Sequence, residues 1–199
     1  AWEAVILAKY YGTRIWILHA STAGEFDAIE YCRKHGVVAA GEVTGYQLFF
    51  TADDYKKYGT LIKVSPALRS RLTNKKLWQM VRAGRVAGIC SEHTPHTLEE
   101  KNTSVWKAVS GTPGIQETVA AFITGWVREF GRDSLEEGLR KLAQCASTNI
   151  ADFFDFPQKS GIKKGNDADF VIIDTDNEWL VKKEDLFTKL KWSVYEDMK

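Results

Sequence analysis

The first hundred residues alternate between short apolar runs and longer segments in which apolar residues recur at helical spacing. The apolar runs cover residues 14–21 and 37–44, and a third begins at residue 86. Continuous runs of this kind are typical of strands buried on both faces of a parallel sheet. The repeated order of strand and helix therefore predicts an α/β fold with a parallel sheet or barrel.

The segments before and between the apolar runs predict three helices. Thr22 followed by Glu25 is a capping-box pattern, which marks the start of one helix. Thr73 is the expected cap of another. The three predicted helices cover residues 2–11, 22–35 and 74–83.

The pattern changes in the second half of the chain. Helical spacing predicts helices over residues 115–130 and 134–147. Residues 160–169 are rich in turn-forming residues and lead into an apolar run at 170–174, which predicts a strand. We therefore expect two parts, a partial barrel over residues 1–157 and a small β-rich segment over residues 158–199.

Each predicted strand of the first half ends in a side chain that can bind metal or exchange protons. His19 ends the first strand, Glu42 lies near the end of the second, and Glu92 and His93 follow the third. The C-terminal ends of parallel strands meet at one edge, where the active sites of α/β folds are built. The shared edge favours a functional site over polar strand ends that merely lead into loops.

Composition narrows the classes of partner and compartment. The 199 residues include 27 basic and 26 acidic ones, for a net charge of +1, which gives no indication of nucleic acid or an anionic membrane as partner. The sequence has no apolar run long enough to span a membrane and no signal-peptide pattern. Cys32, Cys90 and Cys145 form no CxxC pair and are expected to be reduced thiols of a cytoplasmic protein, with Cys90 inert in its strand.

The residues at the strand ends suit a divalent metal. Neutral imidazole and carboxylate are zinc ligands, and a zinc ion activates water as a nucleophile at neutral pH. A nearby carboxylate can accept and return the proton. The separation of His19 from Glu92 is long, so the two do not form a local motif.

Several motifs in order resemble the C-terminal half of the cyclic amidohydrolases, the family of dihydroorotases, hydantoinases (dihydropyrimidinases) and allantoinases. Residues 17–21 (ILHAS) resemble the family strand that carries a metal-binding histidine. Residues 41–44 (GEVT) resemble the start of its EVTPHHL motif. The other matching segments are SPALR at 65–69, SEHTPHTLEEK at 91–101, GTPGIQE at 111–117 and the G-I and D-A-D positions within 161–169.

The resemblance implies a TIM-like (β/α)₈ metal-dependent barrel with a small β-sandwich appendage, and metal-assisted hydrolysis of a cyclic amide, ureide or imide. His19 matches a metal ligand of the family. Glu92 matches an Asp that binds metal and acts as the general base, so Glu92 is the expected catalytic residue and second metal ligand. The positions that match substrate-contacting residues, partly through backbone groups, are Ser65, His96, Ser110 and Gly111.

The sequence also departs from the family pattern. Glu92 replaces an Asp, and a catalytic group displaced by about 1 Å can lose on the order of 10²-fold in rate. The family's HxH pair, its carboxylated lysine and its HAE histidine are not in this sequence. We therefore expect the metal centre to be incomplete in this chain alone, and expect a homo-oligomer or a partner segment that completes the barrel. The alternative is a non-catalytic amidohydrolase-like protein or fragment that acts in assembly. The SPALR segment is more similar to hydantoinases and the EHTPHTLEEK segment to dihydroorotases, so the sequence does not identify which cyclic substrate is used.

Overall fold

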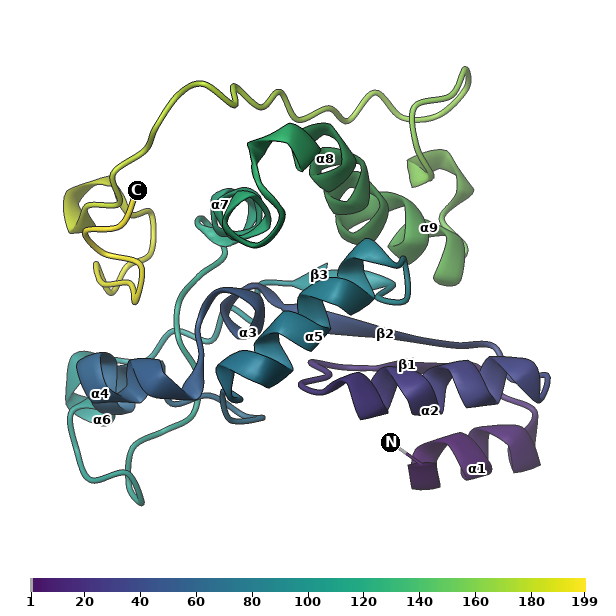
Figure 1. Ribbon diagram of the computed structural model, residues 1–199, viewed down its shortest axis with the longest axis horizontal. Helices are drawn as coiled ribbons and strands as arrows, with labels where there is room; N and C mark the ends of the chain where they lie inside the picture. The colour runs from purple at the N-terminus through teal and green to yellow at the C-terminus, as the bar shows by residue number, and fades with distance from the viewer. Residues whose placement is uncertain (1) are drawn as a thin grey trace.

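Three parallel strands lie at the centre of the molecule in the computed structural model, which describes residues 2–199 (Figure 1). The strands are β1 (Ile15–Ile17), β2 (Ala39–Thr44) and β3 (Gly88–Cys90), and β2 lies between the other two. Both pairs are parallel, and the register places Glu42 opposite Gly88. This arrangement confirms the predicted α/β class.

The helices of the first half begin and end close to the predicted positions. Helix α1 (Trp2–Tyr11) coincides with the prediction, and α2 (Ala23–Lys34) begins with the expected capping box. In that box the backbone N–H of Thr22 donates to the Glu25 carboxylate at 2.8 Å. The side chain of Glu25 therefore occupies an N–H group that a helix start leaves unpaired.

Helix α5 (Arg71–Arg82) begins three residues before the predicted start, so the assignment of Thr73 as its cap was wrong. The cap is Ser70, whose hydroxyl accepts from the Thr73 backbone N–H at 3.3 Å. The indole N–H of Trp78 donates to the Leu48 carbonyl at 2.8 Å, which fastens α5 to the helix that follows β2.

The helices after residue 110 are more broken than their apolar spacing predicts. Helix α7 (Thr118–Phe130) starts three residues later than expected. The helix predicted over 134–147 is α8 (Leu135–Ala143), which continues through a π-helical turn over Gln144–Thr148 into α9 (Asn149–Phe153). The shorter elements are α3 (Gly45–Phe49), α4 (Tyr55–Tyr58), α6 (Leu98–Lys101) and the 3-10 turns Ala52–Asp54, Gly59–Ile62, Arg132–Ser134, Pro157–Lys159 and Lys183–Asp185.

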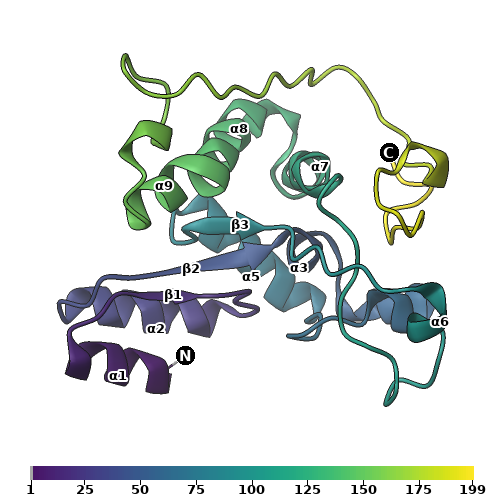
Figure 2. The same cartoon turned by 180° about the vertical axis from the view of Figure 1, so that it is seen from behind.

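One hydrophobic core lies between the sheet and the helices α1, α2, α5, α7 and α8 (Figure 2). Trp78 and Trp126 are its largest aromatic members, followed by Phe26 and Phe122, and all four are buried. Small residues allow the helices to approach: a Cβ on Gly125 would lie 2.6 Å from the Trp78 ring. Burial of aromatic side chains of this size is the largest single source of stability that such a core offers.

Residues 158–199 contain no strand, although the sequence predicts one at 170–174. The segment runs in extended form across the top of Figure 1 to the C-terminal turns. Ile172 is 96% exposed and Val171 81% exposed. An apolar run becomes a strand only when a neighbouring strand pairs with its backbone, and residues 2–199 supply none here.

The C-terminal turns belong to a second, smaller core. Leu186, Trp192 and Tyr195 are buried there against Tyr46 and Phe50, which follow β2. The rings of Phe50 and Tyr195 are 4.9 Å apart. This core places the last residues of the chain beside the C-terminal end of the sheet. Among residues 2–199, no helix combines the length and the apolar character that crossing a membrane requires.

Candidate functional site

Two neighbouring strands bring three ligand-type side chains together at the C-terminal edge of the sheet. Glu42 lies in β2, Cys90 ends β3, and Glu92 follows it. Their carboxylate and thiol atoms all lie within 4.8 Å of one another. This is the edge at which the sequence predicts a site, and we call these three residues the strand-end cluster.

The backbone changes direction sharply where the strands end. Glu92 adopts a φ of 44° and His19 a φ of 38°, both in the left-handed region that side chains other than glycine rarely enter. The backbone N–H of Ala20 donates to the Glu42 carbonyl at 2.8 Å, so the chain around His19 stays attached to β2 after β1 has ended. β1 is accordingly shorter than the predicted strand.

Trp16 positions Glu42 from the neighbouring strand. The indole N–H donates to the Glu42 carboxylate at 2.8 Å. The ring lies over Gly88, where a Cβ would be only 2.6 Å from it. The ring also packs against Phe153 and Phe154, with ring centroids 4.9 and 5.2 Å away. A fixed indole thus holds one carboxylate of the strand-end cluster in place.

The Cys90 thiol lies beside the carboxylates of the cluster. Its thiol donates to the Glu92 carboxylate at 3.7 Å and accepts from the Glu92 backbone N–H at 3.3 Å. Burial, together with the charges of Glu42 and Glu92, raises the pKa of Cys90 to about 11.

Tyr46 borders the same cluster. It is 4% exposed, and burial raises the pKa of its phenol, with the charges of Glu92, Cys90 and Glu42 adding to the effect. The hydroxyl therefore stays protonated and available as a hydrogen-bond donor. Residues 45–47 stand where the EVTPHHL motif has a Pro and two His residues. The mismatch in this motif gave no indication that Tyr46 lies beside the cluster.

The strand-end cluster has the chemistry of a divalent metal site. Thiolate and carboxylate are zinc ligands at about 2.0–2.3 Å, so two ligands of one ion lie within about 4.6 Å of each other. All the ligand atoms of the cluster lie within 4.8 Å of one another, so the three side chains form a candidate site for one divalent ion. Among residues 2–199, His19 is not part of this group. It lies at the end of β1, with β2 between it and Glu92.

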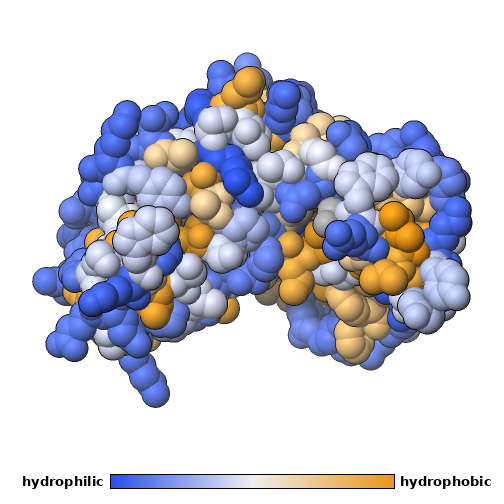
Figure 3. Space-filling view, turned by 90° about the horizontal axis from the view of Figure 1, so that it is seen from below, coloured by the Kyte–Doolittle hydropathy of each residue, from blue (hydrophilic) through white to orange (hydrophobic). Residues whose placement is uncertain are grey.

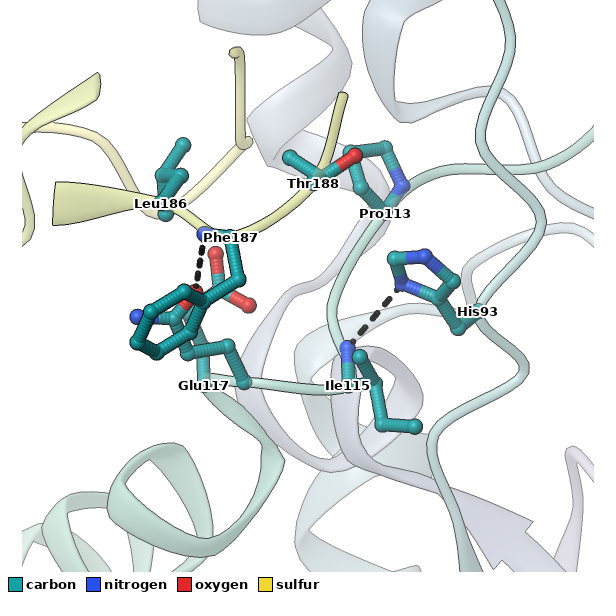
Figure 4. Close-up of a pocket in the computed structure, with 8 residues that line it drawn as sticks. His93, Pro113, Ile115, Glu117, Leu186, Phe187 and Thr188 are labelled. Carbon is teal, nitrogen blue, oxygen red and sulfur yellow. Dashed lines mark hydrogen bonds between the residues drawn. The ribbon is translucent and has the colours of Figure 1, made fainter. Parts of the chain in front are cut away.

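His93 holds the loop that follows residue 110. Its Nδ1 accepts from the backbone N–H groups of Gly114 and Ile115, at 3.2 and 3.3 Å. A nitrogen that accepts two such bonds carries no proton, so the neutral ring bears its proton on Nε2. His93 also lines a cavity of about 340 Å³ between this loop and the C-terminal turns, together with Glu117 and Phe187 (Figure 4).

His96 lies farther along the same loop. Its Nδ1 is 3.7 Å from the Glu100 carboxylate, and its backbone carbonyl accepts from the Trp192 indole at 2.9 Å. The second bond fastens the loop to the C-terminal turns. No contact in the described part of the chain joins the His96 ring to the strand-end cluster, so its expected substrate role stays a prediction.

The structure brings the other predicted substrate residues onto two adjoining loops. Ser65 and Ser110 are exposed and Gly111 is buried. The Gly111 N–H donates to the Lys63 carbonyl at 2.9 Å, two residues before Ser65. Gly111 has a φ of 131°, and a Cβ there would lie 2.3 Å from the Thr94 hydroxyl, so only glycine fits.

Comparisons with known proteins cover almost the whole chain. It is 33% identical over 194 residues to an allantoinase of Rubrobacter xylanophilus, which covers 97% of this chain and 42% of that protein. It is 34% identical over 200 residues to a dihydroorotase of Thermococcus kodakarensis, covering 99% of this chain and 44% of that protein. The chain thus spans less than half the length of these relatives. No protein-family model matches it.

Solved structures give a consistent result. The L-hydantoinase (dihydropyrimidinase) from Arthrobacter aurescens superposes with a TM-score of 0.89 at 28% identity, covering 98% of this chain and 43% of that one. A D-hydantoinase from Thermus sp. superposes with a TM-score of 0.86 at 21% identity, which shows likeness of fold alone. Sequence and structure relatives therefore agree, and they include all three enzyme names in the predicted resemblance.

Proposed function

Because the chain belongs to the cyclic amidohydrolase family, we propose that it carries part of the active site of an enzyme that hydrolyses a C–N bond of a cyclic amide or ureide. The observation that carries this proposal is the strand-end cluster. It places the carboxylate of Glu92, at the family's general-base position, beside two further ligand-type side chains at the C-terminal edge of a parallel sheet.

In the proposed reaction, Glu92 accepts a proton from the attacking water and returns it to the leaving ring nitrogen. A C–O bond forms at the carbonyl carbon while its C–N bond breaks. Glu42, Cys90 and Glu92 would hold a zinc ion, with His19 joining from β1. When bound, zinc supplies Lewis-acid polarisation of the carbonyl and lowers the pKa of water. Ser65, Ser110 and Gly111 would orient the ring.

We propose that the three strands are part of a (β/α)₈ barrel. The order β1-β2-β3 is that of consecutive parallel strands, each followed by a helix or loop that returns to the next strand. Residues 158–199 would belong to the small β-domain of the family, where the exposed run at 170–174 would pair with strands from another segment. The extended conformation and exposure of that run support this.

A second chain or segment would complete the barrel. β1 is an edge strand of the sheet, and unpaired sheet edges promote association. Helix α1 beside it exposes apolar side chains, with Ile6 64% and Leu7 56% exposed. Figure 3 shows hydrophobic residues on the right of the face seen from below, the side on which α1 lies. Sedimentation should show association, and a stable monomer would contradict this.

Hydrolysis assays with added zinc test the proposed reaction. Allantoin, hydantoin, dihydroorotate and dihydrouracil would be compared, and elemental analysis would measure the bound metal. The substitution Glu92→Asp restores the family residue and should raise the rate, on the order of 10²-fold if the extra methylene misplaces the carboxylate. Absence of both turnover and bound zinc, in the wild-type chain and in this variant, would overturn the proposal for this chain.

The alternative is a non-catalytic role in assembly. The observation that favours it is Glu92 itself, whose carboxylate accepts from the Cys90 thiol instead of standing free. A chain that binds no zinc yet forms a defined oligomer would support this function. The three free thiols of the chain are consistent with the reducing cytoplasm as its compartment in either case.

A further inference from the structure

Lys101 is a completely buried charged side chain next to the predicted substrate loops. Its relative exposure is 0%, and its ammonium donates to three backbone carbonyls. These belong to Lys63, Val109 and Gly111, at 3.0, 3.1 and 2.6 Å. Two of the three carbonyls lie on either side of Ser110, and the third is two residues before Ser65.

Lys63 makes the reciprocal connection. Its ammonium donates to the carbonyl of Val105 at 2.8 Å and to that of Ala108. Its own carbonyl accepts from the Gly111 N–H as well as from Lys101. Lys101 therefore binds the carbonyl of Lys63, and Lys63 binds carbonyls of the loop that follows Lys101. We call these two side chains and their carbonyl partners the lysine clasp.

The clasp determines the direction of one peptide group. Because a trans peptide is planar, the N–H of each residue points opposite to the carbonyl of the residue before it. The Val109 carbonyl points at the buried ammonium of Lys101. The N–H of Ser110 therefore points away from the protein interior, at a residue that is exposed.

We propose that Lys101 is a positioning residue that holds the Ser110 N–H as a hydrogen-bond donor for a carbonyl or carboxylate oxygen of the ring substrate. The inference deepens the proposed function and rests on it, because it assumes that a cyclic amide binds at these loops. Lys101 itself touches no substrate; it acts through the peptide that it orients. The positive charge behind that peptide also favours an electron-rich oxygen in front of it.

The cost of burying this ammonium supports a specific role. A buried charge is unfavourable unless it is fully hydrogen-bonded, and a methionine would fill a similar volume without a charge. Burial and the neighbouring charge of Lys63 lower the pKa of Lys101 to about 8. Three carbonyl partners match the three hydrogens of the ammonium, a count that neither methionine nor glutamine can provide.

Amide hydrogen exchange by NMR tests the positioning role in the whole chain. In Lys101→Met, exchange of the Gly111 N–H, which is bonded to the Lys63 carbonyl, should accelerate at least tenfold, while amides of β2 stay unchanged. The matched control is Lys107→Met, which removes an exposed lysine of the same loop and should change neither. Should the methionine variant fail to fold, Lys101→Gln keeps a donor and is read in the same way. Unchanged exchange at Gly111, or an equal increase in β2, would overturn the role.

Titration with hydantoin separates this proposal from the proposed function. Binding should shift the Ser110 amide resonance, and Lys101→Met should need at least tenfold more hydantoin for the same shift. That result without any turnover would leave the positioning role standing and overturn the proposed hydrolysis. Turnover without a shift at Ser110, or no shift with any of the four ring compounds, would overturn the positioning role.

Discussion

The strand-end cluster and the lysine clasp build adjoining parts of one edge in different ways. The cluster takes its geometry from the ladder between parallel strands, with Glu42 in β2 and Cys90 at the end of β3. The clasp orders irregular loops, where a buried ammonium binds carbonyls that no strand pairs. The strand ladder fixes the backbone of the cluster, whereas the loop backbone is held by the ammonium groups of two lysines. The two regions should therefore respond differently to substitution.

The largest expected effect is on hydrolysis, through the strand-end cluster. Glu92→Gln keeps the size of the side chain but removes proton transfer, and should lower kcat on the order of 10³-fold with the fold intact. Glu99→Gln, an exposed carboxylate of α6, is the control and should leave kcat unchanged. Equal rates for the two variants would remove Glu92 from the mechanism.

The clasp should show itself in the pH dependence of stability. The pKa of Lys101 falls from 10.5 to about 8 on folding, so between these values the unfolded chain binds more protons than the folded one. Stability therefore rises with pH across this window, by about 3 kcal/mol from this group. The difference in unfolding free energy between wild type and Lys101→Met should grow by that amount from pH 8 to 10.5.

Urea unfolding at several pH values measures this difference. Groups such as Tyr46 titrate in both proteins and cancel in the comparison. Lys107→Met provides the baseline, because its lysine is exposed. A gap between wild type and Lys101→Met that stays constant with pH would contradict a lowered pKa for Lys101.

A smaller effect is expected where the indole packs on the sheet. In Gly88→Ala the added Cβ would lie 2.6 Å from the rigid Trp16 ring and 3.0 Å from the Glu42 Cβ. Overpacking of this kind should cost about 2 kcal/mol in unfolding free energy. Gly24→Ala, in the first turn of α2, meets only an ordinary contact at 3.9 Å and should not destabilise. If Gly88→Ala left the unfolding free energy unchanged, the Trp16 indole would be free to move away from the added methyl group.

The smallest effect concerns the short helix that carries Lys101. The Thr97 hydroxyl accepts from the Glu100 N–H at 3.2 Å and caps α6. Thr97→Ala should cost about 1 kcal/mol, and its effect on exchange of the Gly111 N–H should resemble a weak form of Lys101→Met. Thr103→Ala is the comparison, and thermal unfolding measures both. If Thr97→Ala also accelerates exchange in β2, the cap stabilises the whole fold and does not act specifically on the lysine clasp.

The strands and their shared edge could be predicted because they depend on local pattern. Apolar runs located β1, β2 and β3, and parallel topology placed Glu42 and Glu92 together. The residues that set the fine geometry could not be found in this way. The contact of the Cys90 thiol with Glu92 depends on how the backbone turns after β3, which an apolar run does not describe. Lys101 looked like an ordinary charged residue of a loop, since its burial depends on a distant segment around Lys63.

The same limit explains the expected strand at residues 170–174. The apolar residues there match the pattern of a strand. A strand also needs a second segment to pair with, and the pattern of a single segment does not show whether one is present. The start of α5 shows a milder form of the problem. Ser70 and Thr73 are both good caps by composition, and only the backbone conformation at Ser70 decides between them.

The indole of Trp16 has a further consequence for the strand-end cluster. Its N–H binds Glu42, and its ring packs against Phe153 and Phe154 at the end of α9. This one side chain therefore connects a carboxylate at the sheet edge to a helix more than a hundred residues later in the sequence, and a displacement of α9 would be passed on to Glu42 through it.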